Sequence, residues 1–130
     1  MTNLKSFQLR LIIISSLLCL GAIATAASPI YIWKGQRVGY HDGYYFPVSV
    51  GHAGNPTPVG RYTVKKKVVD YWSRKYKRAM PYSVFFTDAH AIHSGDLYTE
   101  SKGCVRVDRQ VAMWLYSKAK TGSTKVIVKP

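Results

Sequence analysis

The chain has 130 residues, which is enough for one domain and too few for two ordinary ones. Its residues are 47% hydrophobic and 13% aromatic, so it can bury a core and is not a disordered tail, a collagen, a coiled coil or a dense disulfide scaffold. Its formal net charge is +13, from 19 Lys and Arg against 6 Asp and Glu, which favours anionic partners.

The first 26 residues have the organisation of an export signal. Lys5 and Arg10 precede an uncharged, largely apolar stretch over 11–24, and Ala24-Thr25-Ala26 fits the small-residue pattern of a signal-peptidase site. The stretch is shorter than the roughly 20 residues that a membrane-spanning helix needs. We therefore expect residues 1–26 to be a signal peptide, cleaved after Ala26, with no stable membrane anchor left behind.

Cleavage leaves one domain, residues 27–130, with a single cysteine. Cys19 is removed with the signal peptide, so Cys104 has no partner for an internal disulfide. Removal of Lys5 and Arg10 lowers the net charge from +13 to +11. A lone thiol in an oxidising compartment is buried and inert, paired with another chain, or chemically active, and its neighbours in the sequence decide between these alternatives.

Short strands are expected over most of this domain. A β-branched and aromatic composition, broken by a loop over 51–58 that is rich in Gly, Asn and Pro, predicts strands at 30–33, 44–50, 61–69, 82–86, 89–93 and 125–129. The segments 82–86 and 89–93 are predicted to form a hairpin around Thr87-Asp88.

One helix is predicted after Asp108, which is a good N-cap residue. Gly122 is placed to end this helix. One helical face carries a mostly apolar set: Val111, Trp114, Leu115 and Lys118.

Cys104 and His93, eleven positions apart, suggest nucleophilic catalysis by a thiol, and a structural histidine at position 93 is the alternative that spacing alone leaves open. A thiol is a weak nucleophile at its usual pKa near ~8.5, and a nearby imidazole makes thiolate available at neutral pH. Gly103 permits a sharp turn in which successive N–H groups converge, as an oxyanion hole requires. Lys102 and Arg106 add positive potential that favours the thiolate.

The residues around Cys104 also resemble a known family. Ser101-Lys-Gly-Cys-Val-Arg-Val107 is similar to the [S/T]-x-G-C-[I/V]-R signature of the L,D-transpeptidase (YkuD-type) catalytic domain. Further segments resemble the family in the same order, over nearly all of the domain: 47–51 (PVSVG), 57–64 (TPVGRYTV), 80–86 (MPYSVFF), 91–93 (AIH) and 121–128 (TGSTKVIV). The resemblance implies a compact, mostly β, sandwich- or barrel-like fold with one helix after the cysteine loop.

The resemblance also implies a function. It describes an exported, cysteine-dependent acyl transferase that acts on peptidoglycan stem tetrapeptides in the periplasm or cell-wall space. Cys104 would be the nucleophile and His93 its general base, while the carbonyl of Ser94 would orient the imidazole in place of a triad carboxylate. No metal or organic cofactor is implied, and a monomer is expected.

Further site residues follow from the same resemblance. The backbone N–H groups of Lys102, Gly103 and Cys104 would form the oxyanion hole. Arg106 would hold a substrate carboxylate or brace the loop. The remaining two substrate-binding assignments are Ser101, which would hydrogen-bond within the loop, and Tyr82 of the Met-Pro-Tyr segment.

Two features depart from the family pattern. Lys102 stands where the family commonly has His, and only ten residues separate His93 from Cys104, fewer than is usual. The shorter loop predicts a smaller lid or a more open cleft. Both departures bear on substrate choice and on the balance between transfer and hydrolysis.

Some of these residues, and the basic runs, admit other interpretations. Asp88, His90 and His93 can be drawn as metal ligands, but i and i+3 on a strand point to opposite faces. The basic runs Lys65–Lys67 and Arg74–Arg78 are interleaved with aromatics and can be a solvated face, an attraction for anionic envelope polymers, or a nucleic-acid surface. The signal peptide disfavours nucleic acid.

Three functions therefore compete. The first is the acyl transferase, the second an L,D-carboxypeptidase or murein-stem hydrolase on the same fold, and the third a non-catalytic, basic murein-binding module. Cys104, His93 and Gly103 together argue against the third, because a binding module needs none of them. How the acceptor site admits an amine or water separates the first two.

Overall fold

The structure of the protein is a computed structural model that describes residues 27–130. The predicted signal peptide, residues 1–26, lies outside the described residues. The described part contains nine strands and one helix: β1 Ile30–Trp33, β2 Val38–His41, β3 Tyr44–Pro47, β4 Gly60–Thr63, β5 Lys66–Ser73, β6 Arg78–Phe85, β7 Ala91–Ser94, β8 Val105–Val107, α2 Arg109–Lys118 and β9 Lys125–Lys129. The prediction of a mostly β fold with one helix after the cysteine loop is confirmed.

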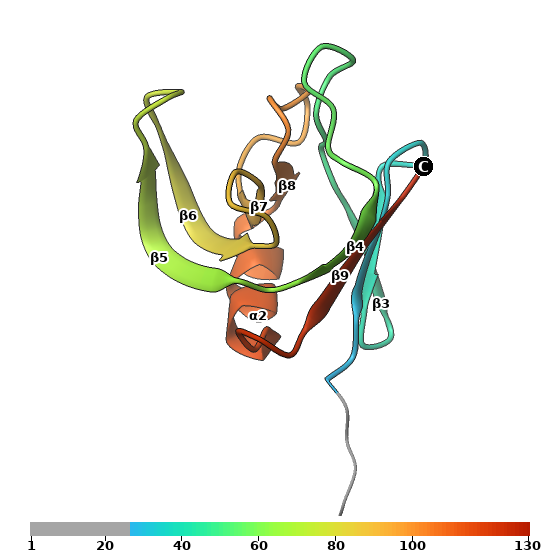
Figure 1. Cartoon of the computed structure of the whole chain (residues 1–130). Helices are drawn as coiled ribbons and strands as arrows, with labels where there is room; N and C mark the ends of the chain where they lie inside the picture. The colour runs from blue at the N-terminus through green and yellow to red at the C-terminus, as the bar shows by residue number, and fades with distance from the viewer. Residues whose placement is uncertain (1–26) are drawn as a thin grey trace, which may run out of the picture.

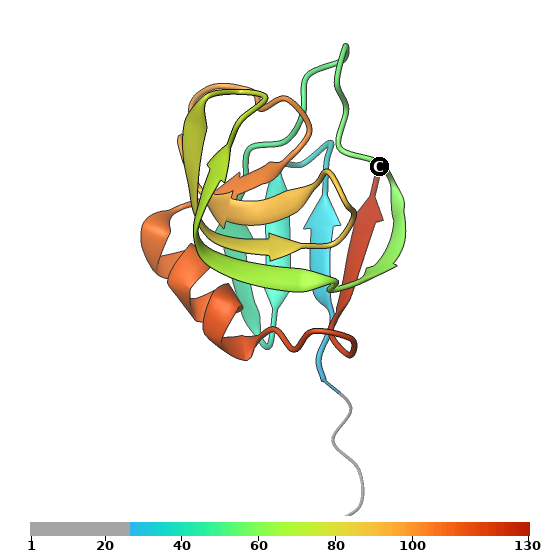
Figure 2. The same ribbon diagram turned by 60° about the vertical axis from the view of Figure 1, so that its left-hand side comes forward.

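Two sheets face each other across the core. One has five strands in the order β3-β2-β1-β9-β4, and the other has four in the order β5-β6-β7-β8. Helix α2 packs against β6 and β7. In both ribbon views the tip of the β5–β6 hairpin lies at the same end of the molecule as the loops that precede β4 and β8 (Figures 1 and 2).

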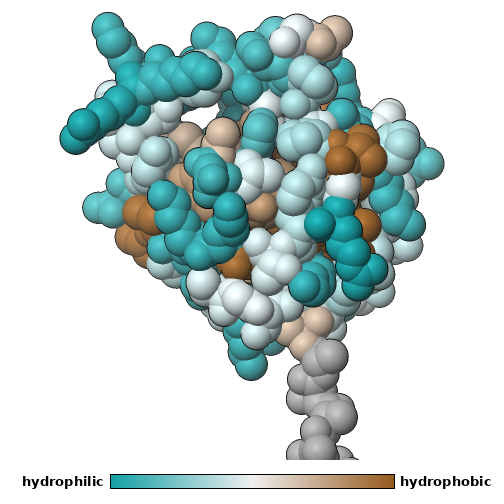
Figure 3. Space-filling model, viewed as in Figure 1, coloured by the Kyte–Doolittle hydropathy of each residue, from teal (hydrophilic) through white to brown (hydrophobic). Residues whose placement is uncertain are grey.

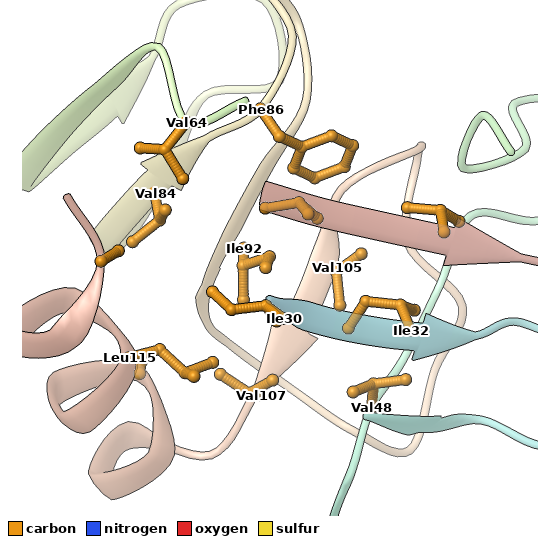
Figure 4. Packing of buried hydrophobic residues seen from close by; sticks show 14 of the residues in the cluster. Ile30, Ile32, Val48, Val64, Val84, Phe86, Ile92, Val105, Val107 and Leu115 are labelled. Atoms are coloured by element: carbon orange, nitrogen blue, oxygen red, sulfur yellow. The ribbon is translucent and has the colours of Figure 1, made fainter. Parts of the chain in front are cut away.

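The core lies between the sheets. Ile30 and Ile32 of β1 point toward Ile92 and Val105 of the four-stranded sheet, and Leu115 of α2 closes the lower side (Figure 4). All five side chains are at most 1% exposed. This face of the four-stranded sheet is therefore fixed by packing, which leaves its other face for a second, smaller apolar cluster around Met80, Phe85 and Ala91.

The single strand predicted over 61–69 is wrong, because the chain changes sheets within it. Residues up to Thr63 belong to β4, and residues from Lys66 belong to β5. The Val64 N–H donates to the Thr124 carbonyl at 2.9 Å, whereas the next N–H, of Lys65, donates to the Phe85 carbonyl at 2.8 Å. Continuous β propensity shows that the segment is extended, but not which sheet pairs with it.

Other boundaries also differ from the prediction. β3 ends at Pro47 instead of running to residue 50, because the chain then pairs with the other sheet: Ser49 and Arg106 exchange two backbone hydrogen bonds, each of 2.9 Å. The hairpin predicted around Thr87-Asp88 exists between β6 and β7, but β6 begins earlier, at Arg78, and pairs along its whole length with β5. The strands β2 and β8 were not predicted.

Helix α2 begins as predicted and ends earlier. Asp108 is the N-cap, and its carboxylate accepts the Val111 N–H at 3.0 Å. The helix ends at Lys118 with Ala119 as its C-cap, and Gly122 lies in the turn that follows. At ten residues it cannot span a bilayer, and no helix of residues 27–130 is long and apolar enough to do so.

Candidate active site

The parallel pair β7–β8 puts the predicted nucleophile and base on one face of the sheet. His93 is in register with Arg106, and Ile92 with Val105, so Cys104 lies beside Ala91. Side chains alternate along a strand, so His93 and Cys104 share the face opposite the main core. The buried Val105 and Ile92 on the core face hold this register, because a slip of one residue would turn them outward.

Cys104 is half-buried beside the turn that leads into β7. Its Sγ accepts the Ala91 N–H at 3.5 Å and lies 4.0 Å from the Ala89 carbonyl oxygen. Burial raises the pKa of the thiol, and the Ala91 N–H and the charge of Arg106 oppose that shift without cancelling it. Positive potential was expected to favour the thiolate, but desolvation is the larger effect, so the resting group is a neutral thiol.

His93 is 5% exposed and held in one tautomer. Its Nδ1 lies 2.8 Å from the Ser94 carbonyl oxygen, which can only accept a hydrogen bond, so Nδ1 carries the proton. Burial lowers the pKa of His93, more than the Ser94 hydrogen bond raises it, and Arg106 and Arg78 lower it further. The neutral ring therefore leaves Nε2 with a free lone pair, which is what a general base requires.

Two pockets lie against Cys104, on the face described above. The narrow one has a volume of about 40 Å³ and is lined by His93, Arg106 and Cys104 together with Tyr76, Arg78 and Met80 among others. The wide one has a volume of about 370 Å³ and is lined by Cys104 with His90, Asn55, Phe85 and Lys75 among others. Tyr76 and Lys102 line both, so the thiol lies where the two pockets meet.

The cysteine loop is tied internally and to the loop before β4. The Ser101 hydroxyl donates to the Cys104 carbonyl at 2.5 Å and accepts the Gly103 N–H at 3.1 Å. The Thr57 hydroxyl, which is fully buried, donates to the Gly103 carbonyl at 2.8 Å and accepts the Gly51 N–H at 2.9 Å. Of the three N–H groups expected in the oxyanion hole, that of Gly103 is therefore engaged, which leaves those of Lys102 and Cys104.

Arg106 braces the loop that follows His93. Its Nη2 donates to the Thr99 carbonyl, to the Thr99 hydroxyl at 3.2 Å and to the Ser49 hydroxyl at 3.3 Å. The guanidinium thus fixes the loop through Nη2, while its buried Nε is left without a partner among the described residues.

Tyr82 is not brought to the site. Its ring packs against Tyr116 of α2, with centroids 5.8 Å apart, and under Arg109 at 5.4 Å. It lines neither pocket that contains Cys104. The Met-Pro-Tyr segment reaches the site through Met80 instead.

Sequence reasoning missed other residues at the site. The sequence places Thr57 only in the loop over 51–58, although its position in the 57–64 motif was a signal. Tyr76 and Arg78 were assigned only to a basic surface run, and they line the narrow pocket because β6 starts earlier than predicted. His90 was considered only as a metal ligand.

The residues once drawn as metal ligands have separate partners. Asp88 is exposed and paired with Lys65 at 2.8 Å, His90 contacts Thr87, and His93 contacts Ser94. Residues 27–130 contain no group of three His, Cys, Asp or Glu side chains that could hold a metal ion.

The fold and the site define a β-rich domain that carries an imidazole on β7 and a thiol directly before the paired strand β8, with the thiol where two pockets meet. The family model of the L,D-transpeptidase catalytic domain, YkuD, matches residues 24–128, so the chain belongs to this family. No curated protein matched the sequence.

Solved L,D-transpeptidase structures share this fold. The enzyme from Stackebrandtia nassauensis is 23% identical with a TM-score of 0.72, over 82% of this chain and 57% of that one. An enzyme from Mycobacterium tuberculosis H37Rv is 25% identical with a TM-score of 0.72, over 81% and 58%. L,D-transpeptidase 3 of Mycobacterium tuberculosis, in complex with a faropenem-derived adduct, is 23% identical with a TM-score of 0.71, over 81% and 61%. The present chain thus spans less than two thirds of the length of each.

Proposed function

We propose that this chain is an exported L,D-transpeptidase that transfers peptidoglycan stem peptides through a thioester on Cys104. One observation carries the proposal. Cys104 and His93 line the same pocket from paired strands, and the Ser94 carbonyl fixes the tautomer that leaves the imidazole Nε2 unprotonated. A fixed base beside a thiol is the arrangement that thiol nucleophiles use.

Acylation follows from the neutral pair. His93 Nε2 takes the thiol proton as Sγ adds to the carbonyl that precedes the terminal D-Ala of a stem tetrapeptide. The C–N bond then breaks, His93 returns the proton to the leaving amine, and D-Ala departs, so a thioester remains on Cys104. A neutral acid–base pair suits this step, because the proton moves only when the nucleophile attacks.

Deacylation uses the same groups in reverse order. The amine of a second stem enters beside the thioester and loses a proton to His93 as it attacks. The new amide forms and Sγ leaves as the thiol. The two pockets that meet at Cys104 support one subsite for the donor and one for the acceptor.

The charge around the cleft fits an anionic substrate. Arg78 lines the narrow pocket, Lys75 the wide one and Lys102 both. Figure 3 shows hydrophilic side chains over the tip of the β5–β6 hairpin, with a more apolar surface beneath it. We propose that these cations attract the carboxylates of stem peptides and, beyond them, anionic envelope polymers, and that export through residues 1–26 brings the monomeric enzyme to them.

Hydrolysis on the same site is the second candidate. The volume of the pocket on the His90 side of Cys104, about 370 Å³, favours it, because a pocket of this size admits water to the thioester. The product is then the tripeptide stem with loss of D-Ala, as in an L,D-carboxypeptidase.

Purified muropeptides followed by mass spectrometry test these alternatives together. We expect cross-linked dimers from the wild type, and neither dimers nor D-Ala release from Cys104→Ala. D-Ala release without dimers would replace the transferase by the hydrolase. Unchanged muropeptides that co-sediment with the protein would replace both by a binding module.

A further inference from the structure

His90 is a second imidazole beside the cysteine loop, and it has no part in the acylation step described above. It lines the wide pocket together with Cys104, whereas His93 lines the narrow one. A Cβ built on Gly103 would lie 3.1 Å from His90 Nε2, so the ring edge rests against the backbone of the cysteine loop. The positive φ of Gly103, 124°, and its missing side chain permit this approach.

Thr87 fixes the tautomer of His90. The Thr87 hydroxyl oxygen accepts the N–H of Ala89 at 3.1 Å and that of His90 at 2.9 Å, which uses both of its lone pairs. Its own proton is therefore the one shared with His90 Nδ1, 2.7 Å away. Because Nδ1 accepts, the proton of the neutral ring resides on Nε2.

The two histidines thus have opposite roles built into their surroundings. His93 donates from Nδ1 to a carbonyl and presents a basic Nε2, whereas His90 accepts at Nδ1 and presents an Nε2–H. Burial lowers the pKa of His90, so the ring stays neutral at neutral pH. A neutral imidazole that donates to developing negative charge is an established way to stabilise an oxyanion.

One of the three backbone donors expected in the oxyanion hole is already engaged elsewhere. The Gly103 N–H is directed to the Ser101 hydroxyl at 3.1 Å, so this donor is engaged within the loop. His90 Nε2–H lies against the same glycine.

We propose that His90 is a catalytic residue whose Nε2–H donates a hydrogen bond to the oxyanion formed when Cys104 attacks, in place of the Gly103 N–H. The carbonyl π electrons move onto the oxygen as the S–C bond forms, and the His90 proton is shared but not transferred. When the C–N bond breaks, the C=O bond re-forms and the hydrogen bond weakens. The proposal rests on the thioester mechanism proposed above.

Two reactions of the same thiol separate this role from a structural one. We expect a carbapenem to acylate Cys104 through a tetrahedral oxyanion, whereas iodoacetamide would alkylate it by displacement without one. Removing one oxyanion-hole donor costs on the order of 10²-fold in rate. We expect His90→Phe to slow carbapenem acylation, followed by intact mass, by about 10²-fold and to leave the iodoacetamide rate unchanged.

Three further variants test the N–H donor of His90 and the Thr87 hydroxyl that selects its tautomer. His90→Gln keeps an N–H donor and should recover part of the acylation rate. Thr87→Val removes the hydroxyl that selects the tautomer and should slow acylation selectively, while Thr87→Ser should match the wild type. Near-UV circular dichroism checks that each variant is folded.

The outcomes discriminate between the two proposals. Wild-type acylation by His90→Phe, or equal losses in acylation and alkylation, would overturn the role of His90 alone. A wild-type thiol that reacts with iodoacetamide but not with the carbapenem would overturn the thioester mechanism and this role with it.

Discussion

Replacement of Thr57 by valine removes a hydroxyl that ties two loops together beneath Cys104. The side chain is fully buried, and valine has nearly the same shape, so packing is preserved. Two hydrogen bonds are lost, one to the Gly103 carbonyl at 2.8 Å and one from the Gly51 N–H at 2.9 Å. The perturbation is therefore almost purely polar.

The expected loss in the free energy of unfolding follows from the two backbone groups that Thr57→Val leaves without partners. A buried polar group without a partner costs about 1–3 kcal/mol. The Gly103 carbonyl is enclosed, whereas Gly51 is half-buried and can gain some solvent, so we expect the free energy of unfolding to fall by about 2–4 kcal/mol. The cysteine loop also loses its anchor, so acylation of Cys104 should slow even where the variant is fully folded.

Urea unfolding of residues 27–130 measures the change, with Thr57→Ser as the matched control. Serine keeps the hydroxyl and loses one methyl group, so Thr57→Ser should lower the free energy of unfolding by about 1 kcal/mol. A Thr57→Val midpoint indistinguishable from that of Thr57→Ser, with unchanged acylation, would show that the hydroxyl does not hold the loop.

Three further predictions concern titration, export and the helix. Because burial lowers the pKa of His93, activity should persist below pH 6.5 and decline only at lower pH. The unfolded state binds the proton more readily than the folded state, so the free energy of unfolding should also decrease as the pH falls below 6.5. An acid limb above pH 6.5 in the pH–rate profile would contradict the role of His93 as the general base. Mature protein from the envelope should begin at Ala27 on N-terminal sequencing, and retention of Lys5 and Arg10 would identify an uncleaved anchor instead. Asp108→Ala should cost about 1 kcal/mol in urea unfolding, whereas Asp108→Ser should retain most of the cap, and equal losses would refute capping.

The site was predictable where its chemistry is local. Cys104 and Gly103 lie in one short motif and His93 ends another, so the residues themselves suggest the thiol and its base, whereas the role of the Ser94 carbonyl came only from the resemblance to the family. The N-cap role of Asp108 could also be predicted from the sequence, since an N-cap depends only on the few residues that follow it.

The remainder depends on contacts between distant segments. The switch of sheets at Val64 is decided by Thr124 and Phe85, which no local propensity contains. Gly39 lowers the local β propensity of β2, yet the structure requires glycine there, because a Cβ at this position would lie 2.2 Å from the nearest carbon of the Phe46 ring. The place of His90 beside Gly103 likewise depends on the β6–β7 turn, which brings a residue thirteen positions away against the cysteine loop.

The thioester on Cys104 is the central claim, and its mass tests it most directly. The protein is mixed with a stem tetrapeptide, the reaction is quenched in acid and the protein is digested. The mass of the peptide that contains Cys104 is then measured by mass spectrometry. The account predicts a mass increase equal to the tetrapeptide less D-Ala, present in the wild type and absent from His93→Ala at short times. Release of D-Ala with no adduct at any time, or turnover by Cys104→Ala, would contradict it.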